Sequence, residues 1–285
     1  MSWAKIQHRF SPGQDAAFVV GGWINAAHGN GFRILISIVG QPGEMGDFDA
    51  YIAAYSAFAA SVAGLGADAI EVWNEPNIDR EWRADMINGA NYTRLLASAY
   101  AAIKARNPST LVITGAPAPT GFFGSAGCGA GSCNDDMFMA QMANAGAANY
   151  ADCIGLHYNE GVLPPSASSG DPRGAYPTYY FAGMLGRAAA FASKPLCFTE
   201  LGYLSPEGYG ALPGAFGWAA NTSVGQQAAY LGEAVRLARG SGRVLLVIIW
   251  NVDFTSFSGD PMAGYAIIRP GGGCPACDTL AAGMS

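Results

Sequence analysis

Charged side chains are scarce in this 285-residue chain. They make up 13% of the sequence, with 15 Lys and Arg against 21 Asp and Glu, and the formal net charge is -6 at pH 7. Proteins that bind nucleic acids or anionic lipid surfaces use clustered cationic side chains. Because the chain has no surplus of them, we expect no nucleic-acid partner and a neutral ligand.

Long hydrophobic runs are also missing. The longest apolar segment, residues 244–250, is far shorter than the roughly 20 residues that a membrane-spanning helix needs. Residues 1–10 lack the basic start and apolar stretch of a secretory signal. We therefore expect no membrane partner, and either an intracellular protein or one whose signal has been removed.

Histidine is rare, which bears on metal chemistry. The three residues, His8, His28 and His157, are not spaced as ligands on one strand. A metal-dependent hydrolase is therefore disfavoured, and we expect no metal and no cofactor.

The six cysteines fall into three groups. Two groups are close pairs, Cys128 with Cys133 and Cys274 with Cys277, and each pair could form a short-loop disulfide; a zinc site built from all four thiolates is the weaker alternative. The remaining two, Cys153 and Cys197, lie inside apolar runs, and we expect them to be buried free thiols.

Seven short β-rich runs are separated by segments of helical periodicity. Several runs are continuous Ile, Leu and Val stretches, which is typical of strands buried on both faces of a parallel sheet. This order predicts a single α/β domain over residues 1–285, most simply a (β/α)8 TIM-type barrel. A doubly wound open sheet is the alternative, and the lack of a Gly-rich phosphate loop after any strand weakens its nucleotide-binding version. The runs are residues 3–7, 33–39, 69–73, 111–114, 153–157, 195–199 and 244–250.

Polar residues at the ends of these strands are the candidate reactive groups, because barrel enzymes carry them at the C-terminal ends of strands. The run 69–73 leads into Asn74 and Glu75, and the run 195–199 leads into Glu200. In a barrel, strands separated by two others lie across the lumen from each other. Two carboxylates are therefore expected to face one mouth, which is the arrangement that glycoside hydrolysis needs.

These segments resemble clan A of the glycoside hydrolases, whose members carry Asn-Glu at the end of the fourth barrel strand and a second Glu at the end of the seventh. The resemblance implies a retaining glycosidase acting on β-linked oligo- or polysaccharides. Glu75 matches the acid/base and Glu200 the nucleophile, with their carboxyl groups expected about 5–5.5 Å apart. The matching segments are Trp73-Asn74-Glu75-Pro76-Asn77, Phe198-Thr199-Glu200-Leu201-Gly202-Tyr203, Ile154-Gly155-Leu156-His157-Tyr158 and Ile249-Trp250.

The same resemblance implies roles for further residues. Asn74 matches the residue that binds the sugar 2-hydroxyl. His157 and Tyr158 lie on the strand beside the nucleophile's, where the clan often has a Tyr that donates to the nucleophilic carboxylate; a structural His is the alternative. Trp250 is expected to form the floor of the subsite for the cleaved sugar, and Trp82 to flank the leaving group.

Two features depart from the clan pattern. Counting strands from Glu75 and Glu200 leaves no segment for strand one, so we expect a barrel that is incomplete at its N-terminus, with an open edge through which the chain could form a homo-oligomer. Around strand two, many members place an Arg near the nucleophile, and residues 5–9 offer no clear match. A non-catalytic or vestigial carbohydrate-binding barrel is therefore the alternative function. A polysaccharide substrate and paired cysteines favour an extracellular or periplasmic location.

Overall fold

The computed structural model describes residues 1–120, 127–129, 131–254 and 260–284. The chain packs as two compact units. Unit 1 comprises Met1–Leu156 and Ala188–Thr199, and unit 2 comprises His157–Arg187 and Glu200–Ser285. The strands β7 (Ile154–Tyr158) and β8 (Leu196–Leu201) begin in unit 1 and end in unit 2.

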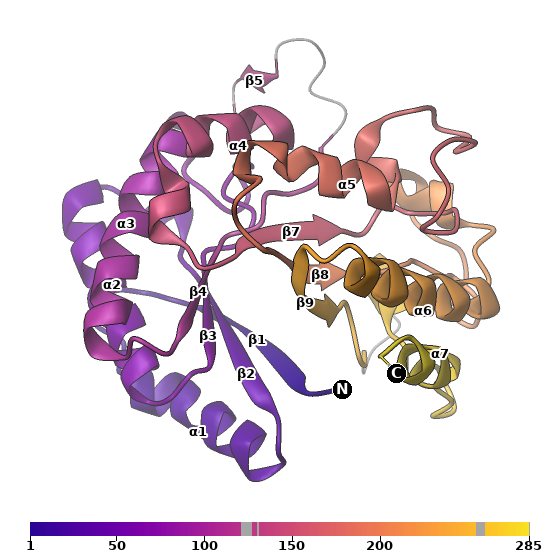
Figure 1. Ribbon diagram of the computed structural model, residues 1–285, viewed down its shortest axis with the longest axis horizontal. Helices are drawn as coiled ribbons and strands as arrows, with labels where there is room; N and C mark the ends of the chain where they lie inside the picture. Colours follow the sequence, from indigo (N-terminus) through magenta and orange to yellow (C-terminus); the bar gives the residue numbers. More distant parts are fainter. Residues whose placement is uncertain (121–126, 130, 255–259, 285) are drawn as a thin grey trace. The chain divides into compact units, whose positions relative to one another are not determined.

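Unit 1 contains a four-stranded sheet whose strands are parallel and follow the order of the sequence. Helices α1 (Ala16–Gly29), α2 (Phe48–Gly64) and α3 (Gly89–Arg106) connect successive strands and lie on one side of the sheet (Figure 1). This repeated β/α order is the predicted α/β class. The strands are β1 (Trp3–Arg9), β2 (Arg33–Val39), β3 (Ala69–Val72) and β4 (Leu111–Thr114).

Helices α2 and α3 form in two of the segments of helical periodicity. The side chains of Asp47 and Asn88 cap α2 and α3 by accepting hydrogen bonds from backbone N–H groups of the first turns. The apolar side chains that recur at helical spacing along α2 and α3 are buried, which fixes each helix against the sheet. These side chains are Tyr51, Tyr55, Phe58 and Val62 on α2, and Tyr92, Leu95, Leu96, Ala99 and Ile103 on α3. Leu65, which continues this spacing just beyond the end of α2, is exposed.

The rest of unit 1 is built from short elements. Helix α4 (Asp135–Asn144) follows a two-stranded antiparallel hairpin of β5 (Cys128–Gly129) and β6 (Ser132–Cys133), which the sequence did not predict. The 3₁₀ helices of this unit are η1 (Pro42–Glu44), η2 (Ala84–Met86), η4 (Ala147–Tyr150) and η6 (Ala188–Phe191).

The prediction of free thiols at Cys153 and Cys197 is wrong, because the two residues form a disulfide within unit 1. Cys153 directly precedes β7 and Cys197 lies in β8, and their Cα atoms are 6.0 Å apart. Neighbouring strands bring two side chains within disulfide distance whatever their separation in sequence. The two close pairs, Cys128–Cys133 and Cys274–Cys277, are also disulfides. The described residues contain no group of His, Cys, Asp or Glu that could hold a metal ion.

Strand β9 (Val244–Ile249) belongs to unit 2 and is the last strand of a three-stranded sheet with the order β7-β8-β9. A capping box, in which Ser223 is followed three residues later by Gln226, begins α6 (Val224–Gly240). Helix α6 packs against α7 (Pro275–Met284), and a Cβ at Gly232 would lie 2.7 Å from the carbonyl oxygen of Thr279, so the close helix contact depends on this glycine. The remaining elements are α5 (Phe181–Arg187), η5 (Pro177–Tyr179), η7 (Gly214–Ala219) and η8 (Pro261–Tyr265).

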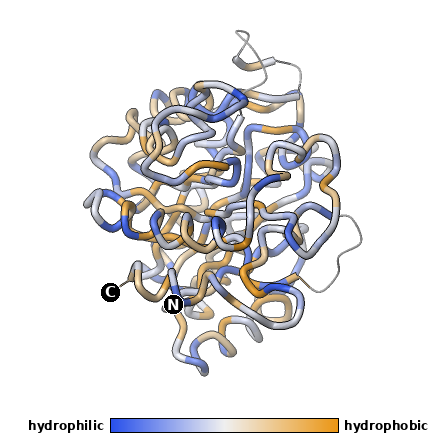
Figure 2. Tube along the Cα trace, turned by 90° about the vertical axis from the view of Figure 1, so that its right-hand side faces the viewer, coloured by the Kyte–Doolittle hydropathy of each residue, from blue (hydrophilic) through white to orange (hydrophobic). Residues whose placement is uncertain are grey.

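Hydrophilic and hydrophobic segments are interspersed along the described part of the chain, as Figure 2 shows. Among the residues described, none of the helices has both the length and the apolar character needed to cross a membrane.

Candidate active site

The turn after β3 has an unusual backbone. Trp73 and Glu75 have φ angles of 76° and 47°, in the left-handed region that residues with a side chain rarely adopt. Such a conformation costs on the order of 1–3 kcal/mol and persists only where the surroundings fix it. Here the Trp73 N–H donates to the Ile38 carbonyl at 2.9 Å, and the Glu75 N–H donates to the Ala116 carbonyl at 2.9 Å. The turn that carries Asn74 and Glu75 is therefore held from both neighbouring strand ends.

Two buried tyrosine hydroxyls stabilise the same strand ends. Tyr55 Oη donates to the Ile38 carbonyl at 2.7 Å and accepts from Trp73 N at 3.0 Å. Tyr92 Oη donates to the Val72 carbonyl at 2.8 Å and accepts from Gly115 N at 2.6 Å. Burial raises the pKa of both hydroxyls, so they keep the protons that these bonds need. Tyr55 therefore bridges the ends of β2 and β3, and Tyr92 bridges the ends of β3 and β4.

Asn74 offers an unused acceptor at this turn. The residue is buried, and its Oδ1 has no hydrogen-bond partner among the described residues. A buried polar atom without a partner is costly in the empty protein. The amide is therefore suited to accept a hydrogen bond from a ligand hydroxyl.

Glu75 lies in a cluster of charged side chains. Its carboxylate is 12% exposed, and Oε2 accepts a hydrogen bond from Arg80 Nη2 at 2.7 Å. Arg80 Nε is 3.4 Å from Glu81 Oε1. Both oxygens of Glu81 contact Arg9, at 3.0 and 2.7 Å. The sequence singled out neither Arg80 nor Glu81 for the site, and Arg9 only as part of a strand without a clear clan match, because no motif links them to Glu75.

Trp82 is a core residue. It is fully buried, and its Nε1 donates to the Met86 carbonyl at 3.2 Å. Its ring packs edge-on against Trp73, with centroids 4.6 Å apart, and also contacts Phe48 and Tyr92. The expectation that Trp82 flanks a leaving group is not supported, because its ring has no exposed face to offer a sugar.

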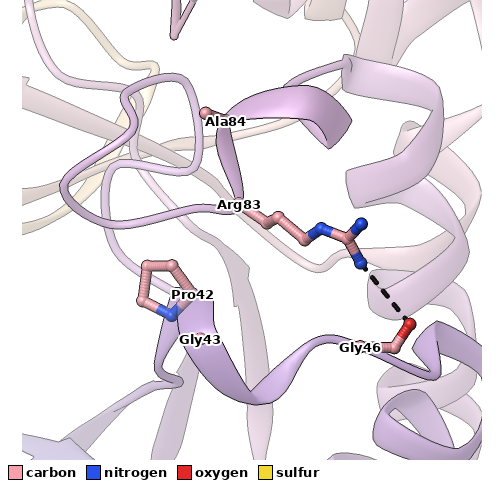
Figure 3. A pocket seen from close by; sticks show the side chains of 5 residues that line it. All are labelled: Pro42, Gly43, Gly46, Arg83 and Ala84. Atoms are coloured by element: carbon pink, nitrogen blue, oxygen red, sulfur yellow. Dashed lines mark hydrogen bonds between the residues drawn. The ribbon is translucent and has the colours of Figure 1, made fainter.

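A surface cavity of about 500 Å³ opens between the loops that follow β2 and β3 (Figure 3). It is lined by Pro42, Gly43, Gly46, Arg83 and Ala84. The Arg83 guanidinium points toward the backbone of Gly46, and its Nη1 donates to the Met45 and Gly46 carbonyls at 3.0 and 3.4 Å. The loop after β3 thus contains Glu75 and also Arg83 and Ala84, which line one side of the cavity.

Glu200 lies near the end of β8, within unit 2, and its carboxylate is 10% exposed. Asn159 Nδ2 donates to Glu200 Oε2 at 3.3 Å, and His157 Nδ1 is 3.8 Å from the same oxygen. Tyr265 Oη donates to the Asn159 carbonyl at 2.6 Å and so fixes this residue. The clan resemblance of the sequence leads to His157, whereas Asn159, directly after β7, has no sequence signal beyond its place at a strand end.

His157 and Tyr158 point to opposite faces of β7, because successive side chains on a strand alternate. His157 is therefore the one beside Glu200, and it is fully buried. Tyr158 Oη donates to the Tyr179 carbonyl at 3.2 Å, and its ring packs against Tyr203. A hydrogen bond from Tyr158 to the nucleophilic carboxylate is not what the structure shows.

Trp250 follows β9 and is half-buried. Its N–H donates to the Leu201 carbonyl at 2.9 Å, and its ring packs on a cluster that includes Leu204 and Tyr265. A Cβ at Gly202 would lie 2.3 Å from the Trp250 carbonyl oxygen, so only glycine fits at that position. Within unit 2, Trp250 is therefore packed close to the strand that carries Glu200.

Unit 2 also contains a second pair of charged residues, Glu160 and Arg173. Glu160 accepts a hydrogen bond from Thr178 Oγ1 at 2.7 Å, and burial raises the pKa of this carboxyl group. The Arg173 guanidinium donates to the Glu160 carbonyl and lies over the rings of Tyr179 and Trp218, at 3.9 and 4.6 Å from their centroids. These residues were not predicted, because they become neighbours only through the folding of the segments that follow β7 and β8.

Comparisons with known proteins show which solved structures share this fold. No family model matches the chain, and no curated protein matches it. Among solved structures, a family 39 glycoside hydrolase from the gut symbiont Bacteroides cellulosilyticus WH2 is similar over 99% of this chain and 57% of its own, with 17% identity and a TM-score of 0.63. The catalytic domain of a family 53 glycoside hydrolase from Ignisphaera aggregans is similar over 98% of this chain and 84% of its own, with 13% identity and a TM-score of 0.66.

A third similar structure is a family 5 xyloglucanase from Paenibacillus pabuli, which covers 100% of this chain and 87% of its own, with 12% identity and a TM-score of 0.59. At these identities the likeness establishes the fold alone. The fold is of the α/β class with parallel strands, as predicted. More narrowly, it is the fold of the clan A glycoside hydrolases, which are (β/α)8 barrels. The chain spans little more than half the length of the family 39 enzyme.

Proposed function

We propose that the protein is a retaining glycoside hydrolase that acts on β-linked oligo- or polysaccharides, with Glu75 as acid/base and Glu200 as nucleophile. The observation that carries the proposal is the fixed turn after β3, which presents Asn74 and Glu75 together from a strained backbone. Strain of this kind gathers at functional sites. The fold, which is shared with glycoside hydrolases, supports the proposal.

Glu200 suits the role of nucleophile. A nucleophilic carboxylate has to be ionised, and hydrogen-bond donors stabilise its charged form. Asn159 donates to Glu200 Oε2 at 3.3 Å, and the His157 ring lies beside the same oxygen. In the proposed first step, a Glu200 oxygen bonds to the anomeric carbon as the glycosidic bond breaks, and Glu75 gives its proton to the departing oxygen.

In the second step Glu75 takes a proton from a water molecule, whose oxygen bonds to the anomeric carbon as the bond to Glu200 breaks. Asn74 Oδ1, which has no partner among the described residues, would accept a hydrogen bond from the sugar 2-hydroxyl. The half-buried ring of Trp250 would pack against the face of the cleaved sugar. The three disulfides fit an oxidising compartment, and we propose an extracellular or periplasmic site of action.

The test is a panel of aryl β-glycosides with three variants. We expect Glu200→Gln to lower kcat at least about 10³-fold on every substrate that the wild type cleaves. Glu75→Gln should spare the first step for a dinitrophenyl leaving group, which departs without a proton, and impair it for a phenyl leaving group. Glu44→Gln, an exposed carboxylate after β2, is the matched control and should retain activity. Full turnover by Glu200→Gln would remove the proposal, and sugar binding without turnover by the wild type would identify a non-catalytic carbohydrate-binding barrel instead.

A further inference from the structure

Arg80 forms an ion pair with Glu75 that the double-displacement reaction does not require. Its Nη2 is 2.7 Å from Glu75 Oε2, inside unit 1. The two side chains differ strongly in exposure, at 70% for Arg80 and 12% for Glu75. A ligand that approaches the Glu75 carboxylate from solvent therefore meets the guanidinium.

Two further ion pairs lie in the same part of unit 1. Arg9 contacts Glu81 through both oxygens, and Lys5 pairs with Glu71 at 3.0 Å. Glu81 is held by Arg9 and is also 3.4 Å from Arg80 Nε. Glu71 accepts from the N–H of Ala116, whose carbonyl accepts from the N–H of Glu75. Arg80 is thus a cation in direct contact with Glu75, whereas Arg9 and Lys5 contact the carboxylates of Glu81 and Glu71.

A guanidinium at hydrogen-bond distance stabilises the ionised form of a carboxyl group. The first step of the proposed reaction needs Glu75 with its proton, whereas the second step needs Glu75 as an ionised base. The observed pair thus favours the form that serves the second step and opposes the first. A sugar seated on the leaving-group side would have to displace the guanidinium from Glu75.

We propose that Arg80 is a positioning residue that keeps Glu75 ionised in the free protein and is displaced by the leaving-group end of the substrate. Glu75 then takes up a proton from solvent in the complex and donates it to the departing oxygen. Arg80 thereby couples the protonation of the acid to occupancy of the leaving-group side. This inference rests on the proposed hydrolase function.

The experiment compares two pH profiles of one enzyme. The profile of kcat/KM reports ionisations of the free enzyme, and the profile of kcat reports those of the complex. For the wild type on an aryl β-glycoside, we expect the alkaline limb of kcat/KM to lie at lower pH than that of kcat. In Arg80→Ala the alkaline limb of kcat/KM should move up by about 0.5–1 pH unit and should meet the limb of kcat. The shift is smaller than a buried charge would give, because solvent screens the exposed Arg80.

Three controls make the result specific. Arg80→Lys should keep most of the separation between the limbs, and Arg80→Gln should repeat the result of Arg80→Ala. Arg94→Ala removes an exposed arginine of α3 that pairs with Asp49, and should leave both profiles unchanged. A kcat/KM limb that stays in place in both Arg80→Ala and Arg80→Gln, with turnover intact, would overturn this inference and leave the proposed function standing. Absence of any turnover in the wild type would overturn both.

Discussion

Removal of the disulfide between Cys153 and Cys197 should cost more stability than any other change to the cysteines. The bond closes a loop with a sequence separation of 44 and joins the beginning of β7 to β8. In the chain-entropy model, a loop of this length restricts the unfolded chain by about 4 kcal/mol at 25 °C. The Cys153→Ala/Cys197→Ala variant is therefore expected to lose about 4 kcal/mol of unfolding free energy.

The matched control is Cys274→Ala/Cys277→Ala, whose disulfide has a sequence separation of 3. The same relation gives a loss of less than about 2 kcal/mol for so short a loop. Equilibrium unfolding in urea, without reductant, measures both variants against the wild type. A loss in the 153/197 variant that is no larger than the loss in the control would refute the reasoning, because loop length would then not set the contribution.

Two further changes test the packing around the candidate site. Tyr55→Phe removes the hydroxyl that bonds both the Ile38 carbonyl and Trp73 N, and should lower the unfolding free energy by about 1–2 kcal/mol in urea titrations; an unchanged midpoint would contradict this. Burial raises the pKa of Glu160, so the unfolded chain ionises first as pH rises and stability falls through that interval. Glu160→Gln should therefore raise Tm relative to the wild type at pH 7, with a difference that shrinks toward pH 4; a lower Tm at pH 7 would contradict the sign.

The sequence predicts the longer strands of this fold well, because most of them are runs of apolar residues with their own local signal, whereas the two-residue strands β5 and β6 have no such run. The run 33–39 coincides with β2, and the run 111–114 coincides with β4. The capping box at Ser223 is likewise local, since its two partners are three residues apart. The positions of Glu75 and Glu200 at strand ends follow from the runs 69–73 and 195–199, which precede them.

What the sequence could not supply are contacts between distant segments. The bond between Cys153 and Cys197 depends on which strands become neighbours, and the Arg80 contact with Glu75 depends on the course of the loop after β3. The roles of His157 and Tyr158 depend on which face of β7 each residue occupies, and a shift of one residue exchanges them. Trp82 is buried against the rings of Phe48, Trp73 and Tyr92, and nothing in its neighbouring residues indicates that packing.

The central claim is that Glu200 forms a covalent bond to the sugar. The wild type is incubated with an activated 2-deoxy-2-fluoro-β-glycoside whose sugar matches the aryl glycoside that it cleaves best. The fluorine slows hydrolysis of the glycosyl-enzyme intermediate, so that the labelled peptide can be identified by mass spectrometry. The account predicts one added glycosyl group on the peptide that contains Glu200, and none in Glu200→Gln. A glycosyl group on another residue, or turnover of the wild type with no covalent adduct, would contradict it.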